Sequence, residues 1–433
     1  MENDPYEDTP QPPDSTFALV ARFFIFIGAG LFLMVMCNSP DAGNNAKDYW
    51  TIWGTRGDFT AGMVGTLFAL AGFIYVYLSF KKQREANDLQ ADSFKHEKVE
   101  SRFFELLGLH RDNVSELSFK YHSAVVRLDE KFIPYPHKIK HELSNRQVFQ
   151  AIKRQFFELV DEVGCLFEES LTNDIYEFAY LQAVKTNTTY VERKIEPNLL
   201  AKVDLLYLIV FFGVGTDGRS TIYSLSEGRY KQAFLNRLLG LAMLKPKVTS
   251  RYFEKWWRIN TSVNKQKILW GLHIRHEDPK ATPEELTEFY FVYGDVYLPF
   301  DPYYPNDYEK YYGGHQFRLG HYFRHLYQTV GFIHRQKHLS PTEKYDYIRH
   351  LRGQLSTDEE IVLFLNSVSQ LGRVWDLETK KDHSPIPKQD QLISTYHLIK
   401  NIPADQIKAD ITLSAFYPQI DYEGFKLVYT SAS

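Results

Sequence analysis

Residues 17–36 read FALVARFFIFIGAGLFLMVM and hold a single charged side chain, that of Arg22. A second apolar run, TAGMVGTLFALAGFIYVYLSF at residues 60–80, holds none. A helix of about twenty residues is about 30 Å long, which is the thickness of the hydrocarbon core of a bilayer. The sequence therefore predicts an N-terminal hairpin of two membrane-spanning helices.

Basic residues predict the orientation of this hairpin. Lys81, Lys82 and Arg84 directly follow the second span, and Arg22 lies close enough to the start of the first span to reach the head groups. Segments rich in Lys and Arg beside a span stay in the cytoplasm. A cleavable signal peptide is disfavoured, because residues 1–15 carry five acidic residues and no Lys or Arg. We expect a two-span protein of the bacterial inner membrane with both termini in the cytoplasm.

The hairpin also carries residues suited to contacts with lipid and with other helices. Trp50 and Trp53, in the connection between the spans, are typical of the interface between membrane and water. Small residues that allow close helix packing occur in both spans, at Gly28, Gly30, Gly65 and Ala69. They could serve packing within one hairpin or between hairpins of several copies, and both interpretations stay open.

Composition limits the classes of protein to which the chain can belong. Its 433 residues include 50 Lys and Arg against 54 Asp and Glu, a formal net charge of −4, and 24% of the residues are charged. These values exclude a disordered chain, a many-span membrane protein and a wholly basic nucleic-acid binder. The two cysteines, Cys37 and Cys165, cannot form a disulfide framework, which indicates a reducing compartment. We expect no cofactor and no metal.

After the hairpin, apolar residues recur at helical spacing. Helices are predicted over residues 88–127, 146–169, 198–213 and 227–244, and that at 198–213 should be buried because residues 205–212 are apolar almost all round. Capping boxes at Ser340 and Ser356 predict two further helices. Residues 297–312 are expected to form the longest loop, and the best strand signal lies at 426–430.

The predicted fold class is mainly α, with the transmembrane hairpin followed by a large cytoplasmic α-helical domain. The expected parts are a disordered acidic N-terminus (1–15), the hairpin (16–80), a juxtamembrane helical region (81–130), the cytoplasmic domain (131–405) and a tail with short strands (406–433).

The candidate for chemistry is FRLGHYFRHLYQTVGFIHRQKH at residues 317–338. On a helix, Arg318, His321 and His325 fall on one face, opposite an apolar stripe. An arginine followed by six residues and a histidine matches the spacing of all-α HEPN ribonucleases, in which the imidazole serves as acid and base and the guanidinium holds phosphate charge. The alternative is an ordinary exposed polar face. The pairs His321/His325 and His334/His338 lack a nearby carboxylate, so we expect no metal there.

Two shorter patterns are assigned no catalytic role. Residues 213–218 satisfy GxGxxG, but they follow a predicted helix rather than a strand, which favours an exit from that helix over a phosphate loop. Residues 378–380, ETK, are similar to the end of a nuclease signature, but no strand pattern precedes them.

Several motifs together resemble the AbiC-like family of phage abortive infection proteins. They are LGHYFRHLY at 319–327, KYDYI at 344–348, LRGQLS at 351–356 and LFLN at 363–366. FFELL at 103–107, FFGVG at 211–215 and the two-span N-terminus are similar as well, so the resemblance is expected to cover residues 16–405. Gly353 stands where the family commonly has alanine.

The resemblance implies antiviral defence in which the infected cell is arrested or killed. The candidate functional residues that it carries over are Gly320, His321, Tyr322, Arg324, Arg352, Gln354, Ser356 and Asn366. Two of them also have structural interpretations, Ser356 as a helix N-cap and Asn366 as a paired polar group in a buried helix.

Three hypotheses for the mechanism follow. In the first, the chain is a non-enzymatic effector that forms homo-oligomers and compromises the inner membrane when its cytoplasmic domain meets a phage-derived trigger or a partner nucleic acid or protein. In the second, it is a membrane-tethered ribonuclease that uses Arg318 and His325. In the third, it is a scaffold that recruits a partner toxin. The lipid bilayer is the one partner that all three share.

Overall fold

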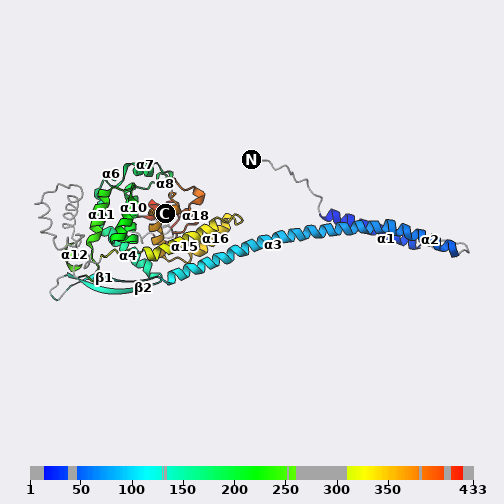
Figure 1. The fold of residues 1–433 in the computed structure, drawn as a ribbon, viewed down its shortest axis with the longest axis horizontal. Helices are drawn as coiled ribbons and strands as arrows, with labels where there is room; N and C mark the ends of the chain where they lie inside the picture. Colours follow the sequence, from blue (N-terminus) through cyan, green and yellow to red (C-terminus); the bar gives the residue numbers. More distant parts are fainter. Residues whose placement is uncertain are drawn as a thin grey trace, which may run out of the picture. The chain divides into compact units, whose positions relative to one another are not determined.

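The computed structural model describes residues 14–37, 46–128, 130, 134–250, 253–259, 310–379, 383–403 and 411–422 (Figure 1). Residues 1–13 of the segment expected to be disordered (1–15) and the expected strand at 426–430 lie outside these residues, as does most of the expected loop at 297–312. The last two residues of the 1–15 segment, Asp14 and Ser15, are helical, because they begin the first helix. The chain divides into two compact units, Met1–Glu100 and Ser101–Ser433, with the boundary inside a long helix.

Two long helical stretches form the described part of the first unit. Helix α1 spans Asp14–Cys37; α2 (Ala46–Phe59), a π-helical turn (Thr60–Val64) and α3 (Gly65–Ser115) follow one another without a break. The stretches Ser15–Cys37 and Trp50–Ser115 are long and apolar enough to cross a membrane, as predicted. The connection between the two spans is helical in its second half, because α2 already begins at Ala46.

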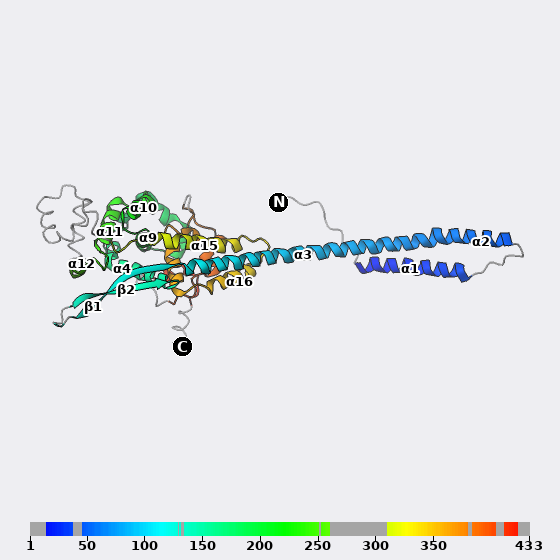
Figure 2. The ribbon, with the colours of Figure 1, turned by 60° about the horizontal axis from the view of Figure 1, so that its bottom comes forward.

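The two stretches pack antiparallel through a narrow stripe, along which they lie side by side in Figures 1 and 2. The Phe17 ring lies 6.0 Å from that of Tyr77, whereas Gly28 lies beside Phe68, whose ring would be 3.5 Å from a Cβ at Gly28. The buried side chains of the second stretch recur every seven residues, at Val64, Ala71 and Leu78. This spacing is typical of knobs-into-holes packing of two helices.

The remaining faces of the hairpin expose large apolar side chains. Phe26 is 76% exposed and Phe73 is 73% exposed. A Cβ at Gly30 or Gly65 would meet no atom within 4 Å, and Ala69 is exposed, so among the small residues singled out in the sequence only Gly28 lies at the contact. Arg22 is exposed near the start of α1, and α3 continues through Lys81, Lys82 and Arg84.

The second unit begins with the end of α3 and an antiparallel β hairpin. Strands β1 (Ser118–Leu128) and β2 (Pro134–Ser144) pair from Ser118↔Ser144 to Leu128↔Pro134. The predicted helix or helix pair over 88–127, and with it the helical region expected at 81–130, is therefore wrong beyond Ser115. Phe119, Tyr121, Ser123 and Val125 alternate with residues on the other face, and aromatic and β-branched side chains favour a pleated strand.

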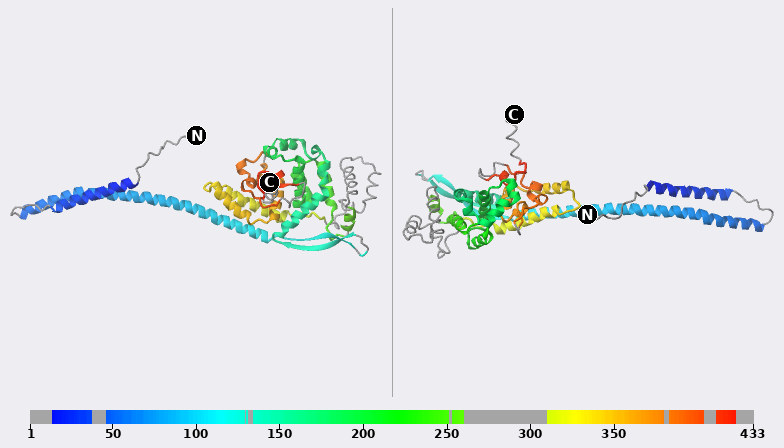
Figure 3. Two further views of the ribbon diagram at one scale, coloured as in Figure 1. Left: turned by 180° about the vertical axis from the view of Figure 1, so that it is seen from behind. Right: turned by 90° about the horizontal axis from the view of Figure 1, so that it is seen from above.

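Helices make up most of the second unit, and the β hairpin lies along one side of them, in contact with α4 (Figure 3). Their bounds are α4 Gln147–Val163, α5 Cys165–Glu169, α6 Thr172–Ile175, α7 Phe178–Thr186, α8 Thr188–Arg193, α9 Pro197–Phe212, α10 Thr216–Ser226, α11 Gln232–Leu244, α12 Phe253–Ile259, α15 Gln316–His334, α16 Pro341–Arg352, α17 Thr357–Val368 and α18 Leu392–Tyr396. Short 3-10 turns lie at Arg373–Trp375, Lys388–Asp390 and Leu413–Ala415.

Helix α9 is the centre of this unit. Every residue from 200 to 210 is at most 5% exposed, and α4, α10 and α17 pack around it. This confirms the prediction of a buried helix at 198–213. The predicted capping boxes are confirmed too, since Ser340 and Ser356 each accept a hydrogen bond from the N–H three residues on, and Glu343 and Glu359 bond back.

A buried ionic cluster ties α9 to the segment after α17. Arg373 is 1% exposed and donates to Asp204 of α9 across 2.8 Å and to Glu378 across 3.2 Å. The Tyr230 hydroxyl donates to the same Asp204 carboxylate across 2.6 Å, and the Tyr190 hydroxyl donates to Glu378 across 3.0 Å. Since each charge has several partners, the cluster can be both buried and stable.

We predict that Asp204→Asn destabilises the chain by about 3–5 kcal/mol, because it removes one charge of a buried ion pair while keeping the side-chain volume. The measurement is the free energy of unfolding of the full chain in detergent. The matched control is Lys388→Ala, which breaks an exposed pair with Glu192 and should cost less than about 1 kcal/mol. Equal effects of the two variants would contradict this role of the cluster.

Candidate functional site

The N-terminal end of α15 is held in place by glycines. Gly314 has a φ of +86°, and a Cβ on it would lie 2.5 Å from the carbonyl oxygen of Phe212 at the end of α9. Gly213 has a φ of +79°, and a Cβ on it would lie 2.6 Å from the carbonyl carbon of Gly313. Only glycine tolerates this conformation and this approach. The next residue, His315, donates its backbone N–H to Phe211 across 2.7 Å, which anchors the start of α15 on α9.

Two hollows flank the first turns of α15. One, of about 480 Å³, is lined mainly by β1, the 311–315 segment and the start of α15; the other, of about 370 Å³, is lined by Phe212 and the next turns of α15. They share Gly313, Gly314 and Phe317, so they adjoin, and we call them together the α15 groove. Three of the residues carried over from the family resemblance, Gly320, His321 and Arg324, line the second hollow.

Arg318 lies in the first hollow. Its Nε donates to the carbonyl oxygen of Ser118 across 2.9 Å, and its guanidinium stacks 4.6 Å from the ring centroid of Phe119. His315 lies beneath it, with Nδ1 3.4 Å from Arg318 Nη1 and Nε2 2.8 Å from Gln155 Oε1. Burial, with a smaller contribution from Arg318, lowers the pKa of His315 to about 3. The ring is therefore neutral at neutral pH and can accept from Arg318.

An aromatic stack forms another part of this hollow. The rings of Phe119 and Tyr121 are 5.2 Å apart and inclined by 10°, and His141 of β2 continues the stack at 4.8 Å. Phe317, on the rim shared by both hollows, is 70% exposed. The groove thus combines cationic groups with exposed ring faces.

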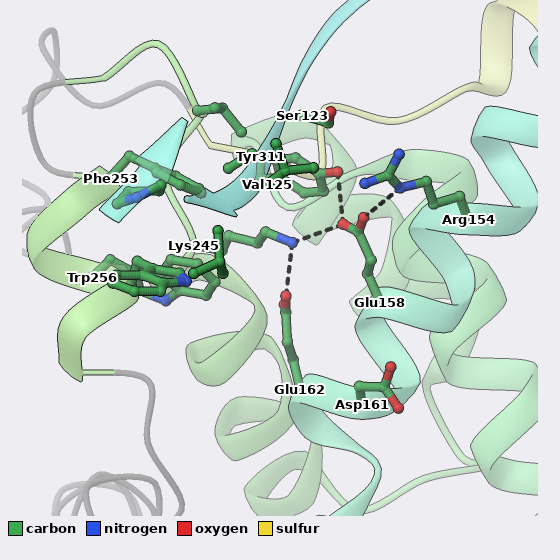
Figure 4. A pocket seen from close by; sticks show the side chains of 15 residues that line it. Ser123, Val125, Arg154, Glu158, Asp161, Glu162, Lys245, Phe253, Trp256 and Tyr311 are labelled. Atoms are coloured by element: carbon green, nitrogen blue, oxygen red, sulfur yellow. Dashed lines mark hydrogen bonds and ion pairs between the residues drawn. The ribbon is translucent and has the colours of Figure 1, made fainter. Parts of the chain in front are cut away.

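A third hollow, of about 280 Å³, lies beside the groove and has a different electrostatic character (Figure 4). In it the Lys245 ammonium lies 2.9 Å from Glu158 and 2.7 Å from Glu162, and 3.7 Å from the centroid of the Tyr311 ring. Burial acts to raise the pKa of Glu158, but Lys245 and the Tyr311 hydroxyl outweigh this effect and hold that pKa below its usual value. Arg154 and Lys245 face the three carboxylates of Glu158, Asp161 and Glu162, so this hollow has no excess of positive charge to offer a ligand.

The two residues of the ribonuclease hypothesis have separate surroundings. His325 lies two helical turns beyond Arg318, about 10 Å along the axis. Its ring stacks on that of His110 of α3 at 6.4 Å, and in the described part of the chain none of the four ring nitrogens has a hydrogen-bond partner. Burial lowers the pKa of His325. Burial also lowers the pKa of His110, to about 4, and the nearby His325 and Arg146 add to this effect.

Tyr322 connects the histidine pair to the cap of α17. It is 1% exposed, packs on Phe149 and His110, and donates its hydroxyl to Glu359 across 3.4 Å. Glu359 is the residue that completes the capping box of Ser356. Tyr322 and Ser356 therefore have structural roles in the core.

The other carried-over residues are also engaged within the fold. Arg352 is 8% exposed and donates to the carbonyl oxygens of Tyr396 and His397, each across 3.2 Å. The backbone carbonyl of Gln354 accepts from Arg146 across 2.5 Å. Asn366 is 3% exposed and lies 3.4 Å from the Tyr207 hydroxyl, in agreement with its structural interpretation.

The sequence analysis missed two features of this unit. It assigned 118–127 to a helix, so the ring faces of β1 were not associated with α15, although the alternation of Phe119, Tyr121 and Ser123 was a signal. It assigned no role to 378–380, yet Glu378 belongs to the buried ionic cluster, whereas Lys380 lies outside the described residues. Within the described residues no three His, Cys, Asp or Glu side chains lie close enough to hold a metal.

We predict that His110 makes the second unit less stable as the pH falls from about 6.5 towards 4. The His110 ring takes up a proton near pH 6.5 in the unfolded chain, but only near pH 4 in the folded chain. Between these two pH values protonation therefore stabilises the unfolded state relative to the folded state. His110→Leu should reduce the slope of unfolding free energy against pH by up to about 1.4 kcal/mol per pH unit. Identical slopes for the variant and the unchanged protein, compared between pH 7.5 and 5, would contradict this.

Comparison with known families confirms the resemblance over part of the chain. Residues 314–407 match the family model described as "Putative phage abortive infection protein". The similar stretches at 103–107 and 211–215 and the hairpin lie outside that match, and no curated protein or solved structure matches the chain. The matched segment begins at Gly314 and includes the whole of α15, α16 and α17. It therefore supplies the residues of the second hollow that come from α15, whereas Phe212 and Gly313 of that hollow lie outside the match.

Proposed function

We propose that the chain is a membrane-anchored effector of abortive infection. In this proposal the hairpin of the first unit lies in the bacterial inner membrane, and the second unit is a cytoplasmic domain that responds to infection. The match at 314–407 supports the role in defence. The observation that carries the membrane assignment is the exposure of the two apolar helices.

A buried helix of a water-soluble core can be as long and as apolar as these helices, but it is covered by its neighbours. In the most apolar windows of the two stretches only 11% and 17% of the residues are buried. Contiguous exposed apolar surface of this extent is unfavourable in water and favourable in lipid. The backbone hydrogen bonds of both helices are satisfied internally, which is the condition for crossing a bilayer.

The proposed orientation follows the charges at the helix ends. Arg22 and the cluster Lys81, Lys82 and Arg84 mark the cytoplasmic side, and Trp50, which is 72% exposed, marks the opposite interface. Both termini would then be cytoplasmic, with the 314–407 segment inside the cell, where phage components accumulate.

The open face of the hairpin suggests how the effector acts. By the open face we mean the exposed surface outside the contact between the two stretches, where Gly30 of α1 and Gly65 and Ala69 of the second stretch leave room for the backbone of another helix to approach closely. We propose that a trigger on the cytoplasmic unit allows hairpins of several copies to associate through it and to compromise the membrane.

Membrane insertion can be tested with a charged residue near the centre of the second span. We predict that the unchanged chain sediments with membranes and resists alkaline extraction. Phe73→Asp should reduce the inserted fraction, since an aspartate at this depth costs about 2.5–3.5 kcal/mol, whereas the control Phe73→Leu should not. A soluble full-length chain would contradict the proposal.

The mechanism can be tested by following membrane potential and total RNA together after infection. For the unchanged chain we expect the membrane to depolarise while total RNA is still intact. The variant Gly65→Leu should depolarise the membrane more slowly, because the leucine fills the open face of the hairpin without touching the contact between the two helices. RNA cleavage before depolarisation, lost in Arg318→Ala or His325→Ala, would contradict the effector mechanism and favour the ribonuclease hypothesis.

A further inference from the structure

We infer that the α15 groove binds single-stranded nucleic acid, with a base stacked on Phe317 and phosphates on Arg318 and Arg324. This goes beyond the proposed membrane effector and does not depend on it, because the binding can be measured on the solubilised chain whether or not the hairpin acts on membranes.

The charge of the groove favours a polyanion. Lys120, Lys247 and Arg318 line the first hollow and Arg324 the second, and no carboxylate of the described residues lines either one. Lys120 is partly balanced by Glu142 at 3.7 Å, an exposed pair of small effect. The hollow around Lys245, only a short distance along α4, balances its cations with three acidic residues. The groove therefore differs from this neighbouring hollow, because Arg318 and Arg324 line it without a carboxylate of the described residues beside them.

Arg318 has the features of a phosphate-binding group. Its Nε is fixed by Ser118, and its guanidinium plane is held against the Phe119 ring. In the described part of the chain no carboxylate pairs with it, so its charge is available to a ligand. Burial lowers the pKa of Arg318, yet an arginine side chain stays charged at neutral pH. Neutral His315 supports the guanidinium without competing for the ligand.

The ring of Phe317 favours a ligand with bases. A phenylalanine that is 70% exposed, on the rim between two hollows, is unfavourable in water and is suited to stacking on a nucleobase. The Arg318 guanidinium lies 4.0 Å from the centroid of this ring, so a stacked base would have a cation beside it. A polyanion without bases would leave the ring unused.

The spacing along α15 favours a strand over a single nucleotide. Arg318 and Arg324 are six residues apart, about 9 Å along the helix. Gly320 lies between them, and a Cβ on it would meet no atom within 4 Å, so the floor of the second hollow is open. A single strand of nucleic acid can place one phosphate at Arg318 and another at Arg324, with a nucleotide base between the two phosphates. In a duplex the bases are stacked inside and cannot reach the ring.

The test is direct binding of a fluorescent ten-nucleotide single-stranded RNA to the full chain in detergent. We expect saturable binding that weakens with salt, and much weaker binding of the same RNA as a duplex. Unlabelled inorganic polyphosphate at equal phosphate concentration should compete poorly. Polyphosphate or the duplex binding as tightly as the single strand would overturn the inference, and so would the absence of binding.

Variants make the test specific to the groove. Phe317→Ala should weaken binding by at least about fivefold, and Phe317→Trp should retain it. Arg318→Ala and Arg324→Ala should each weaken binding and reduce the slope of log affinity against log salt by about 0.7. The matched control is Arg349→Ala on α16, an exposed arginine paired with Asp346, which should leave binding unchanged.

A final variant separates binding from folding. Gly320→Glu places a carboxylate in the second hollow, where it should repel phosphate, while replacing a mid-helix glycine should maintain or raise the unfolding temperature. Binding that is unaffected by both Phe317→Ala and Gly320→Glu would show that the RNA binds elsewhere and would overturn the inference.

Discussion

Apolar side chains cover the outside of the α1–α3 hairpin, and water is a poor solvent for that surface. The stripe between the two helices buries only a narrow row of residues, such as Ala21 and Gly28 of α1 and Ala71 of the second stretch, so the hairpin cannot hide its phenylalanines by its own packing. Either lipid or another apolar surface has to cover them. The first unit is therefore the part of the chain whose environment is most strongly constrained by physical chemistry.

In the second unit the constraint is instead the burial of helix α9 and of the charged side chains packed against it. Helix α9 is covered on all sides, and Asp204 on it requires the partners that Arg373 and Tyr230 supply. The glycines at 213 and 313–314 then allow α15 to start directly against the end of α9. The motif residues divide accordingly. Tyr322, Arg352, Ser356 and Asn366 stabilise the core, whereas Gly320, His321 and Arg324 face the groove.

Local patterns in the sequence were sufficient to predict several parts of the fold. The apolar helices, the buried helix α9 and the capping boxes at Ser340 and Ser356 depend on residues that are close in sequence, and they were predicted correctly. The strand at 118–128 was not, because its apolar spacing just after a long helix is compatible with both structures, and its partner strand is needed to decide between them.

The groove was only partly predictable for a related reason. Helical periodicity placed Arg318 and His325 on one face of α15, but it could not indicate their neighbours. Phe119, which stacks on Arg318, and His110, which stacks on His325, come from segments about 200 residues earlier in the chain. These contacts make Arg318 part of the α15 groove and leave His325 partly buried against another histidine, where burial lowers its pKa.

The two cysteines of the chain offer the most direct test of the central claim, that the hairpin crosses the inner membrane with the second unit inside the cell. Cys37 is exposed at the end of α1, and Cys165 begins α5. In cells with a permeable outer membrane, a maleimide that cannot cross the inner membrane should label Cys37. It should reach Cys165 only after the inner membrane is opened, with Cys37→Ser and Cys165→Ser identifying each signal. Labelling of Cys165 in intact cells, or protection of Cys37 until lysis, would contradict the account.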